Sequence, residues 1–188
     1  LEIILRKAYE KSVLQKENYI LRDEAKTHAF DGLMIGISPK MTAIQRMIEK
    51  VAPTDSSILI EGESGTGKEL VANMIHQKSH RKEQPFIVID CSTLQENLLE
   101  NELFGHEKGA FTGASSQKIG LVELADRGTV IVDEVAEVNT STQAKFLRIL
   151  ETGVLRRVGR TKQLKVDVRV ITATKRVLEH EVKEGKFR

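Results

Sequence analysis

The sequence contains few aromatic residues and almost no cysteine. Tryptophan is absent from its 188 residues, and the aromatic residues make up only 4%. A platform on which nucleic-acid bases stack needs more rings than this, so we do not expect one. The single cysteine, Cys91, excludes an internal disulfide bond and fits a reducing compartment, which predicts a cytoplasmic protein. We expect Cys91 to be a small buried residue rather than a nucleophile.

An excess of one charge and long apolar runs are also lacking. The 29 basic and 27 acidic residues leave a net charge of +2, which gives no electrostatic reason to expect nucleic acid as the main partner. No apolar run approaches the roughly 18–20 residues that span a bilayer. The start, LEIILRKAYEK, has no signal-peptide core, so we expect no membrane partner. Because the chain starts without Met and ends abruptly at KFR, it is predicted to be part of a longer protein.

Residues 1–31 are predicted to form a linker helix ahead of a globular domain at 32–188. Residues 1–27 contain neither Gly nor Pro and alternate charged with apolar side chains. Leu14 and Leu21 lie seven positions apart, but no heptad register holds throughout. An imperfect coiled coil and a solvated helix with one packed face therefore both remain open.

The globular part alternates apolar segments with helical patterns. Strands are predicted at 57–61, 86–90, 129–133 and 168–174. Helices are predicted at 39–51, 68–79, 93–103, 119–126 and 141–152. This alternation predicts an α/β fold, a doubly wound parallel sheet with helices on both faces. Two further segments, 154–158 and 164–168, are expected to form a hairpin around Gly159.

The strongest chemical signal is the segment GESGTGK, which follows a predicted strand and opens a predicted helix. It fits the phosphate-binding pattern G-x-x-x-x-G-K, in which backbone N–H groups and a helix start surround phosphate oxygens. The expected ATP-binding residues are Gly62, Glu63, Ser64, Gly65, Thr66, Gly67, Lys68 and Glu69. Lys68 would reach the β- and γ-phosphates. The alternative is an ordinary glycine-rich turn.

The residue after Lys68 departs from the general pattern. A Ser or Thr that ligates Mg²⁺ is expected there, and this chain has Glu69. A carboxylate beside a triphosphate is repelled unless a metal or water intervenes. The metal is therefore expected to take a ligand from Thr66, from Glu69 through water, or from a second acidic motif.

That second motif is VIVDE, an apolar strand that ends in two carboxylates. Ligands of open α/β sheets bind at the carboxyl ends of the strands. Asp133 is expected to hold Mg²⁺, directly or through water, and Glu134 to polarise the attacking water.

Five segments together resemble the central domain of sigma-54-dependent transcriptional activators, also called bacterial enhancer-binding proteins. They are GESGTGKE, ENELFGHEKGAFTGA, GTVIVDE, RRVG and VDVRVITAT. The GAFTGA hexapeptide is specific to that family. The resemblance implies a P-loop AAA+ ATPase that assembles as a homo-oligomer, a hexameric ring or an inactive dimer, and that remodels the sigma-54 RNA polymerase holoenzyme. The segment 1–31 is similar to the linker that follows the receiver domain in response-regulator members.

The resemblance also assigns the hexapeptide a role at the tip of a mobile loop that touches sigma-54. The partner-binding residues are then Gly109, Ala110, Phe111, Thr112, Gly113 and Ala114. Glycines would serve as hinges and Phe111 as an apolar anchor. The alternative is that Phe111 tucks into its own domain.

Further roles follow from the same resemblance. Ile35 and Gly36 match the position that contacts adenine, although a plain turn is equally compatible. Arg188 matches an arginine finger that reaches the γ-phosphate on a neighbouring subunit. The helical lid that should follow is lacking from this chain, and DNA would be bound only through a helix-turn-helix domain outside it.

Three positions depart from the family pattern. Asp90 stands where a switch Asn usually contacts the glutamate that corresponds to Glu134, and two carboxylates there would repel. Lys175 replaces another Asn, and its cation could compensate for Asp90. Arg127 replaces a common Gly.

The leading prediction is an ATPase that remodels a protein partner. The alternative is a nucleotide-dependent assembly module with weak hydrolysis, because Asp90 and Lys175 alter the switch. A helicase or kinase is not favoured, since basic or aromatic stripes and an acceptor site are lacking.

His76 and His80 are expected on an exposed helix end. The pair Arg156–Arg157 is expected on a solvated hairpin, with a phosphate or interface contact as alternatives.

Overall fold

The computed structural model describes Met34 and residues 36–188. The chain divides into two units, Leu1–Leu33 and Met34–Arg188. The linker-helix prediction for residues 1–31 and the expected adenine contact of Ile35 both lie outside the described residues.

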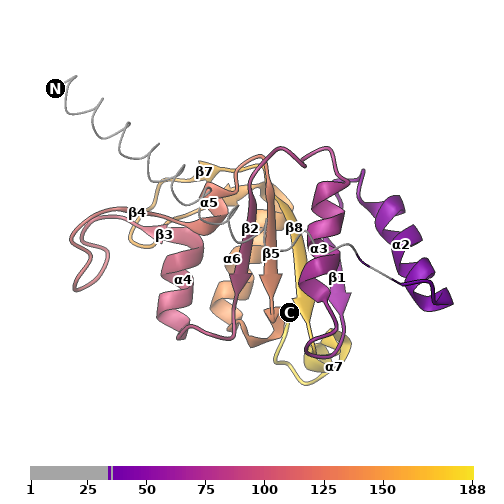
Figure 1. Cartoon of the computed structure of the whole chain (residues 1–188). Helices are drawn as coiled ribbons and strands as arrows, with labels where there is room; N and C mark the ends of the chain where they lie inside the picture. Colours follow the sequence, from indigo (N-terminus) through magenta and orange to yellow (C-terminus); the bar gives the residue numbers. More distant parts are fainter. Residues whose placement is uncertain (1–33, 35) are drawn as a thin grey trace. The chain divides into compact units, whose positions relative to one another are not determined.

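A four-stranded parallel sheet forms the centre of the second unit (Figure 1). Its strands lie in the order β1, β8, β5, β2. Their bounds are Ile58–Glu61 for β1, Phe86–Asp90 for β2, Thr129–Asp133 for β5 and Arg169–Thr174 for β8. All four predicted strands and their parallel arrangement are therefore confirmed. The order places the end of β5 between the ends of β2 and β8.

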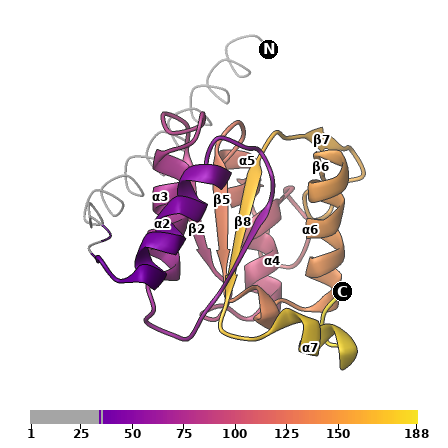
Figure 2. The ribbon, with the colours of Figure 1, turned by 90° about the vertical axis from the view of Figure 1, so that its right-hand side faces the viewer.

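Helices lie on both sides of this sheet, as predicted (Figure 2). They are α2 (Pro39–Val51), α3 (Lys68–Gln77), α4 (Glu96–Phe104), α5 (Leu121–Leu124), α6 (Thr140–Thr152) and α7 (Leu178–Lys183), with a 3₁₀ turn η2 at Val135–Glu137. Local chemistry sets two of the starts. The Ser38 hydroxyl accepts from the Met41 N–H at the start of α2, and the Asn139 side chain accepts from the Thr142 N–H at the start of α6.

Alternating strand residues bury their side chains on opposite faces of the sheet. Ile131 and Ile171 pack in one core with Ile48 of α2 and Ile75 of α3. On the other face, α6 covers the sheet (Figure 2), and its Phe146 ring contacts the Phe104 ring of α4 at a centroid distance of 5.5 Å. These two cores fix α3 and α4 relative to the strand ends.

Two small antiparallel ladders lie beside the main sheet. The predicted hairpin around Gly159 is confirmed with shorter strands, β6 (Val154–Leu155) and β7 (Leu164–Lys165). The predicted helix at 119–126 is partly wrong, because Lys118–Ile119 is strand β4 and pairs with β3, Gly105–His106. Gly120 permits this pairing, since a Cβ there would lie 2.3 Å from the Phe104 carbonyl carbon.

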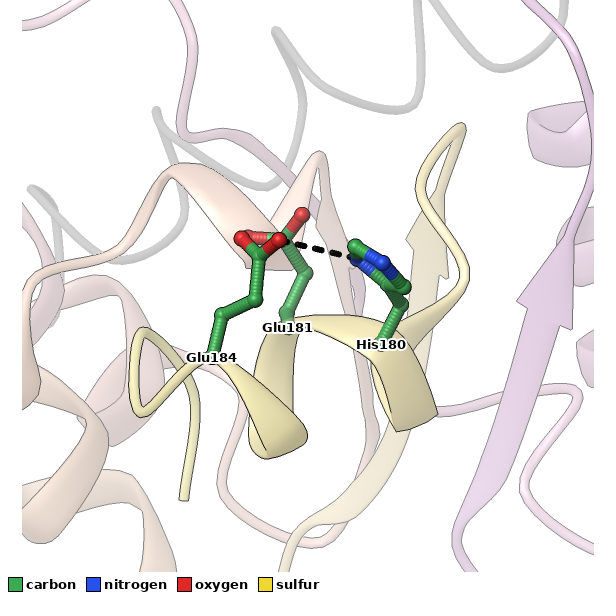
Figure 3. Close-up of side chains that lie close together, drawn as sticks. All are labelled: His180, Glu181 and Glu184. Carbon is green, nitrogen blue, oxygen red and sulfur yellow. Dashed lines mark ion pairs between the residues drawn. The ribbon is translucent and has the colours of Figure 1, made fainter.

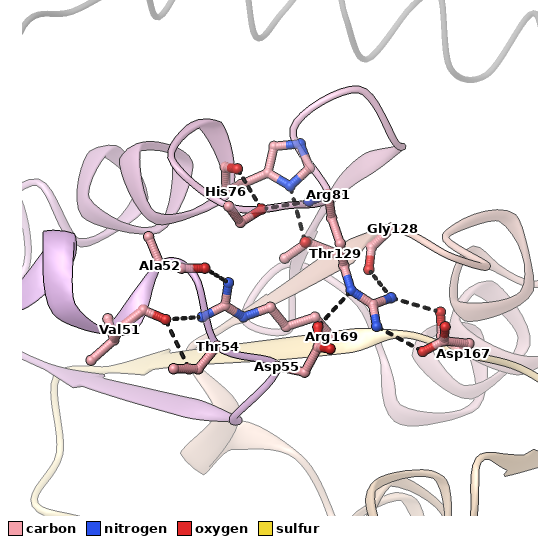
Figure 4. Close-up of polar contacts among 11 residues, drawn as sticks. Val51, Ala52, Thr54, Asp55, His76, Arg81, Gly128, Thr129, Asp167 and Arg169 are labelled. Carbon is pink, nitrogen blue, oxygen red and sulfur yellow. Dashed lines mark hydrogen bonds and ion pairs between the residues drawn. The ribbon is translucent and has the colours of Figure 1, made fainter.

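The amino ends of the strands are held by a polar cluster around Arg169, which is buried, and Arg81 (Figure 4). The Arg169 guanidinium donates to the carbonyl oxygens of Ala52 and Val51, both at 2.8 Å, and so ties β8 to the end of α2. Arg81 donates to the carboxylates of Asp55 and Asp167 at 2.9 and 2.8 Å. The cluster anchors the end of the sheet that faces away from the glycine-rich turn.

The expectation of an exposed His76 is wrong. His76 is only 5% exposed, its Nδ1 lies 3.0 Å from the Thr129 hydroxyl, and its ring packs on Phe86. Burial is the main cause that lowers the pKa of His76 to about 4. The residue is a neutral core histidine, whereas His80 is exposed as expected.

Candidate functional site

The glycine-rich turn, residues 62–67, connects the end of β1 to the start of α3. Gly65 and Gly67 have φ values of +76° and +85°, a conformation that non-glycine residues adopt only with strain. The Gly62 N–H donates to the Thr174 carbonyl at 3.1 Å, which anchors the turn to the end of β8. The turn thus leads into the first N–H groups of α3, the arrangement that binds anionic phosphate groups.

Lys68 places its ammonium inside this turn. The residue is 8% exposed, and its Nζ donates to the carbonyl oxygens of Gly62 and Glu63 at 3.0 and 3.1 Å. Its Nζ also lies 3.9 Å from Oε1 of Glu134. A buried cation held by carbonyl oxygens next to free helix N–H groups fits a phosphate chain, because phosphate oxygens can replace those carbonyl oxygens.

Glu134 is held in an uncommon conformation directly after β5. Its φ and ψ are 51° and 48°, in the left-handed region. The Glu134 N–H donates to Oδ1 of Asp133 at 2.9 Å, and Oε2 of Glu134 accepts from the Lys175 N–H at 3.3 Å. Non-glycine residues in this region are strained by roughly 1–3 kcal/mol and occur preferentially at functional sites. The strain turns the carboxylate toward Lys68.

Glu69 lies among other carboxylates. Burial first, and then the charges of Asp133 and Asp90, raise the pKa of Glu69 above its ordinary value. A cation placed among these groups would reverse that shift, because it favours the ionised form. Carboxylate oxygens are ligands that Mg²⁺ prefers, so Asp133, Glu69 and Asp90 are the residues that could hold a cation here.

Asp90 and Lys175 have partners other than those expected. Asp90 is paired in register with Asp133 across β2 and β5, and its Oδ1 accepts from the N–H and hydroxyl of Ser92 at 2.8 and 2.7 Å. The Lys175 ammonium lies 3.8 Å from Glu137, so the structure pairs this cation with Glu137. The Asp90 carboxylate thus orders the start of the segment that leads into α4.

The hexapeptide Gly109–Ala114 lies in the loop between β3 and β4 (Figure 1). Gly109 and Gly113 have φ values of +82° and +101°, and the Gly109 N–H donates to the Ala114 carbonyl at 2.9 Å. Phe111 is 42% exposed, and its ring lies edge-on against the His106 ring. We call this loop, residues 107–117, the finger, and the strands β3 and β4 that carry it the finger base. A hydrogen bond closes the hexapeptide within it, and the Phe111 side chain is only half covered.

A cluster of charges at the base of the finger was missed by the sequence analysis. Arg157 is buried and donates to both oxygens of Glu123, at 2.6 and 2.8 Å, and to Glu107 at 2.9 Å. Arg160 donates to the same Glu107 oxygen at 2.8 Å. The expectation of a solvated hairpin is therefore wrong for Arg157, although Arg156 is exposed. Only folding brings Glu107, Glu123 and Arg157 together, and no local pattern could have shown it.

The positive charge of Arg157 is secured by these contacts. Burial works against the charge, but the hydrogen bond and charge of Glu123, followed by those of Glu107, outweigh it and raise the pKa of Arg157 above its ordinary value. The ion pairs join the finger to the segment after β6.

Two further residues of the predicted site are Arg188 and Gly36. The Arg188 N–H donates to Oε1 of Gln143 on α6 at 3.0 Å, and its side chain is exposed. Gly36 precedes α2, where Gln45 donates to the Met34 carbonyl at 3.2 Å. Arg188 therefore does not join Lys68 within the described chain.

Among the described residues, the group whose metal-ligating atoms all lie within 4.8 Å of one another is His180 and Glu181 on α7 and Glu184 at its C-cap (Figure 3). Cations already pair with both carboxylates, since Arg176 contacts Glu181 at 3.4 Å and Lys186 contacts Glu184 at 2.6 Å. These pairs account for the cluster without a metal.

The family model for the sigma-54 interaction domain matches residues 34–188. The chain belongs to this family. It is therefore a P-loop AAA+ domain of the sigma-54-dependent activators, as the resemblance implied. The match spans the whole described region and includes the turn, the acidic motif and the finger.

Two curated relatives show how far the similarity extends. The chain is 52% identical over 155 residues to the Nif-specific regulatory protein of Sinorhizobium fredii, covering 82% of this chain and 26% of that protein. It is 48% identical over 176 residues to the anaerobic nitric oxide reductase transcription regulator NorR of Escherichia fergusonii, covering 93% and 35%. The chain thus spans about a quarter to a third of the relatives that it matches.

Solved structures agree with this assignment. NtrX from Brucella abortus in complex with ADP has a TM-score of 0.77 and 40% identity, covering 95% of this chain and 39% of that one. The same protein in complex with ATP has a TM-score of 0.77 and 39% identity, covering 99% and 38%. Among the described residues, no helix has the length and apolar character needed to cross a bilayer.

Proposed function

We propose that this chain binds and hydrolyses ATP and transmits the reaction to a protein partner through the finger. The observation that carries the nucleotide part is Lys68, a buried ammonium that only carbonyl oxygens and Glu134 hold at the start of α3. ATP would replace these partners with its β- and γ-phosphate oxygens, supported by N–H groups of the glycine-rich turn and of the start of α3. The ATP and ADP complexes of NtrX support the choice of nucleotide.

Glu134 is proposed to accept hydrogen bonds from the water that attacks the γ-phosphate. Its strained backbone and its hydrogen bond from the Lys175 N–H fix the carboxylate beside Lys68. Bound Mg²⁺ would neutralise charge on the phosphate oxygens, and Asp133 would hold it with support from Glu69. Positioning of water and phosphate provides most of the rate in phosphoryl transfer.

The connection from this site to the finger runs through α4. Asp90 and Ser92 order the chain beside the acidic motif, α4 begins at Glu96, and α4 ends at Phe104, directly before β3 and the finger (Figure 1). A helix of nine residues is a rigid element of about 13 Å. A change at the end of β5 on loss of the γ-phosphate would therefore tilt α4 and displace the finger base.

The proposed partner is the sigma-54 RNA polymerase holoenzyme. The half-covered Phe111 ring, flanked by Thr112, gives the finger an apolar anchor of the kind enriched at interfaces. Arg188 is proposed to act on nucleotide bound by a neighbouring copy in a homo-oligomeric ring, and DNA to be bound only through a helix-turn-helix domain outside this chain.

A second candidate function is assembly in response to nucleotide with only weak hydrolysis. The observation that favours it is the position of Asp90, whose carboxylate is occupied by Ser92 rather than by Glu134. An amide at this position could donate to Glu134, whereas a carboxylate cannot.

Binding of a fluorescent ATP analogue and release of phosphate by the same chain distinguish these functions. The Glu134→Gln variant should keep analogue affinity and lose about 100- to 1,000-fold in turnover, because the amide cannot accept a proton. Glu151→Gln, an exposed carboxylate on α6, is the matched control and should keep both. Tight binding with no turnover in the native chain, followed by a gain in Asp90→Asn, would support the second function. A native chain that does not bind the analogue contradicts both.

A further inference from the structure

The finger tip rests on a residue of its own base. The ring centroids of Phe111 and His106 lie 4.9 Å apart with planes at 65°, an edge-to-face contact. Aromatic pairs in this geometry are favoured beyond the area that they bury. Because Phe111 is also 42% exposed, one side of its ring is held while the other remains free.

His106 is a fixed platform for this contact. It pairs with Lys118 across β3 and β4 and bridges to Val158 on the other side, so its backbone is held from two directions. Its Nδ1 is buried and has no hydrogen-bond partner among the described residues. A buried ring nitrogen without a partner is unfavourable. The docked state therefore joins a favourable ring contact to a buried nitrogen that is unfavourable.

The hexapeptide of the finger is held in shape by hydrogen bonds of its own. The Ala114 N–H donates to the Phe111 carbonyl at 3.0 Å, and the Gly109 N–H donates to the Ala114 carbonyl at 2.9 Å, so these hydrogen bonds stay within the loop. A Cβ added at Gly109 or Gly113 would meet nothing within 4 Å. Both glycines therefore face open space, and both have positive φ values that glycine adopts without strain.

We propose that His106 is a positioning residue that docks Phe111 against the finger base, and that release of the ring presents the finger to its protein partner. The docking half follows from the contact itself, and the release half rests on the proposed function. Glu107, the next residue, holds the base in place through Arg157 and Arg160 while the tip leaves. The contact with His106 would thus set the fraction of molecules in which the Phe111 ring is free to bind the protein partner.

The absence of tryptophan from the chain makes the test direct. Phe111→Trp provides a single indole at the docking position, and its accessibility is measured by acrylamide quenching without nucleotide. Combining it with His106→Leu should lower the ratio of docked to free indole about fivefold, the effect of losing one aromatic pair. His106→Phe should restore shielding. His80→Leu, at an exposed histidine outside the finger, should change nothing.

Equal quenching in Phe111→Trp chains with His106 and with His106→Leu would overturn the proposal. Failure of His106→Phe to restore shielding of the indole would also overturn it. Circular dichroism and the urea midpoint establish that each variant is folded. If His106→Leu does not fold, His106→Gln replaces it and must give the same release. Adding an ATP analogue should raise quenching only in the Phe111→Trp chain that retains His106. Loss of analogue binding would contradict the proposed function and leave the nucleotide-free comparison valid.

Discussion

The two ends of the central sheet differ in how their polar groups are satisfied. At the carboxyl ends, Lys68 is held by turn carbonyls, Glu134 has a left-handed backbone, and the pKa of Glu69 is raised by burial and its neighbouring carboxylates. At the amino ends, Arg169 and Arg81 donate to carbonyl and carboxylate oxygens from three parts of the chain (Figure 4).

The carboxyl ends of the strands have the features of a binding site, whereas the amino ends stabilise the fold. At the carboxyl ends, the pKa of Glu69 is shifted and Glu134 has a strained backbone, and both features are typical of functional sites. At the amino ends, both terminal nitrogens of Arg169 donate to carbonyl oxygens and Arg81 donates to two carboxylates, so that these groups hold α2 and β8 together. Substitutions at the first end should therefore affect nucleotide binding, and substitutions at the second should affect the free energy of unfolding.

The largest expected effect is on nucleotide affinity at the carboxyl ends. Lys68→Met should weaken binding of an ATP analogue about 100-fold, because charge-assisted hydrogen bonds to phosphate are lost. The free energy of unfolding without nucleotide should change by less than about 1 kcal/mol, since a buried charge is replaced by an apolar side chain of similar length. Fluorescence titration and urea unfolding measure the two. A large loss of stability with affinity retained would reverse the comparison.

The opposite result is expected for Arg169, which is 2% exposed. Arg169→Met should lower the free energy of unfolding by about 2–4 kcal/mol, because the buried carbonyl oxygens of Val51 and Ala52 lose their donors. Urea unfolding measures the change, and Lys165→Met, at an exposed position, is the control. The folded fraction of the variant should bind the ATP analogue normally. A neutral effect would show that Arg169 does not hold α2.

His76 should make the amino end sensitive to acid. Its pKa is about 4 in the folded chain against 6.5 for the ordinary group, so below pH 6.5 the unfolded state takes up a proton that the folded state does not. The free energy of unfolding should fall by about 3 kcal/mol between pH 6.5 and 4 from this group alone. His76→Gln should remove that slope in urea titrations at several pH values. His80→Gln should retain it, and loss of the slope there would contradict this assignment.

The smallest expected effect is at Arg127, the second non-glycine residue with positive φ, at +68°. Arg127→Gly should raise the free energy of unfolding by about 0.5–1 kcal/mol, because glycine adopts this conformation without a Cβ clash. Arg127→Ala should give no such gain, since alanine keeps the Cβ. A gain in Ala equal to that in Gly would attribute the effect to the arginine side chain rather than to the backbone.

Prediction from sequence succeeded where the signal is local. The segment that contains β1, the glycine-rich turn and α3 has its strand, its glycines and its helix start within twenty residues, and the structure confirms each element. The departure from the family pattern at Arg127, where a glycine is common, can also be explained. The φ of this residue is positive, a conformation that glycine adopts without strain. The roles assigned to Glu134, Arg188 and the finger remain predictions.

Prediction failed where a residue's environment comes from distant segments. His76 and Arg157 both belong to polar segments that suggest solvent exposure, yet both are buried. Their partners, Thr129 for His76 and Glu123 for Arg157, lie 53 and 34 positions away in sequence. The same holds for Lys175, whose cation pairs with Glu137 after β5.

By itself, the sequence determined the strands, the order of helices, the phosphate-binding turn and the acidic motif at the end of β5, because these depend on periodicity and on glycine at particular positions. Only the tertiary structure decided which charges meet: Glu107 with Arg157 and Arg160, Arg169 with the end of α2, and Phe111 with His106. The physical reason is that hydrophobic patterns specify which face of an element is buried, whereas an ion pair or ring contact depends on the position of two side chains that distant segments bring within a few ångströms.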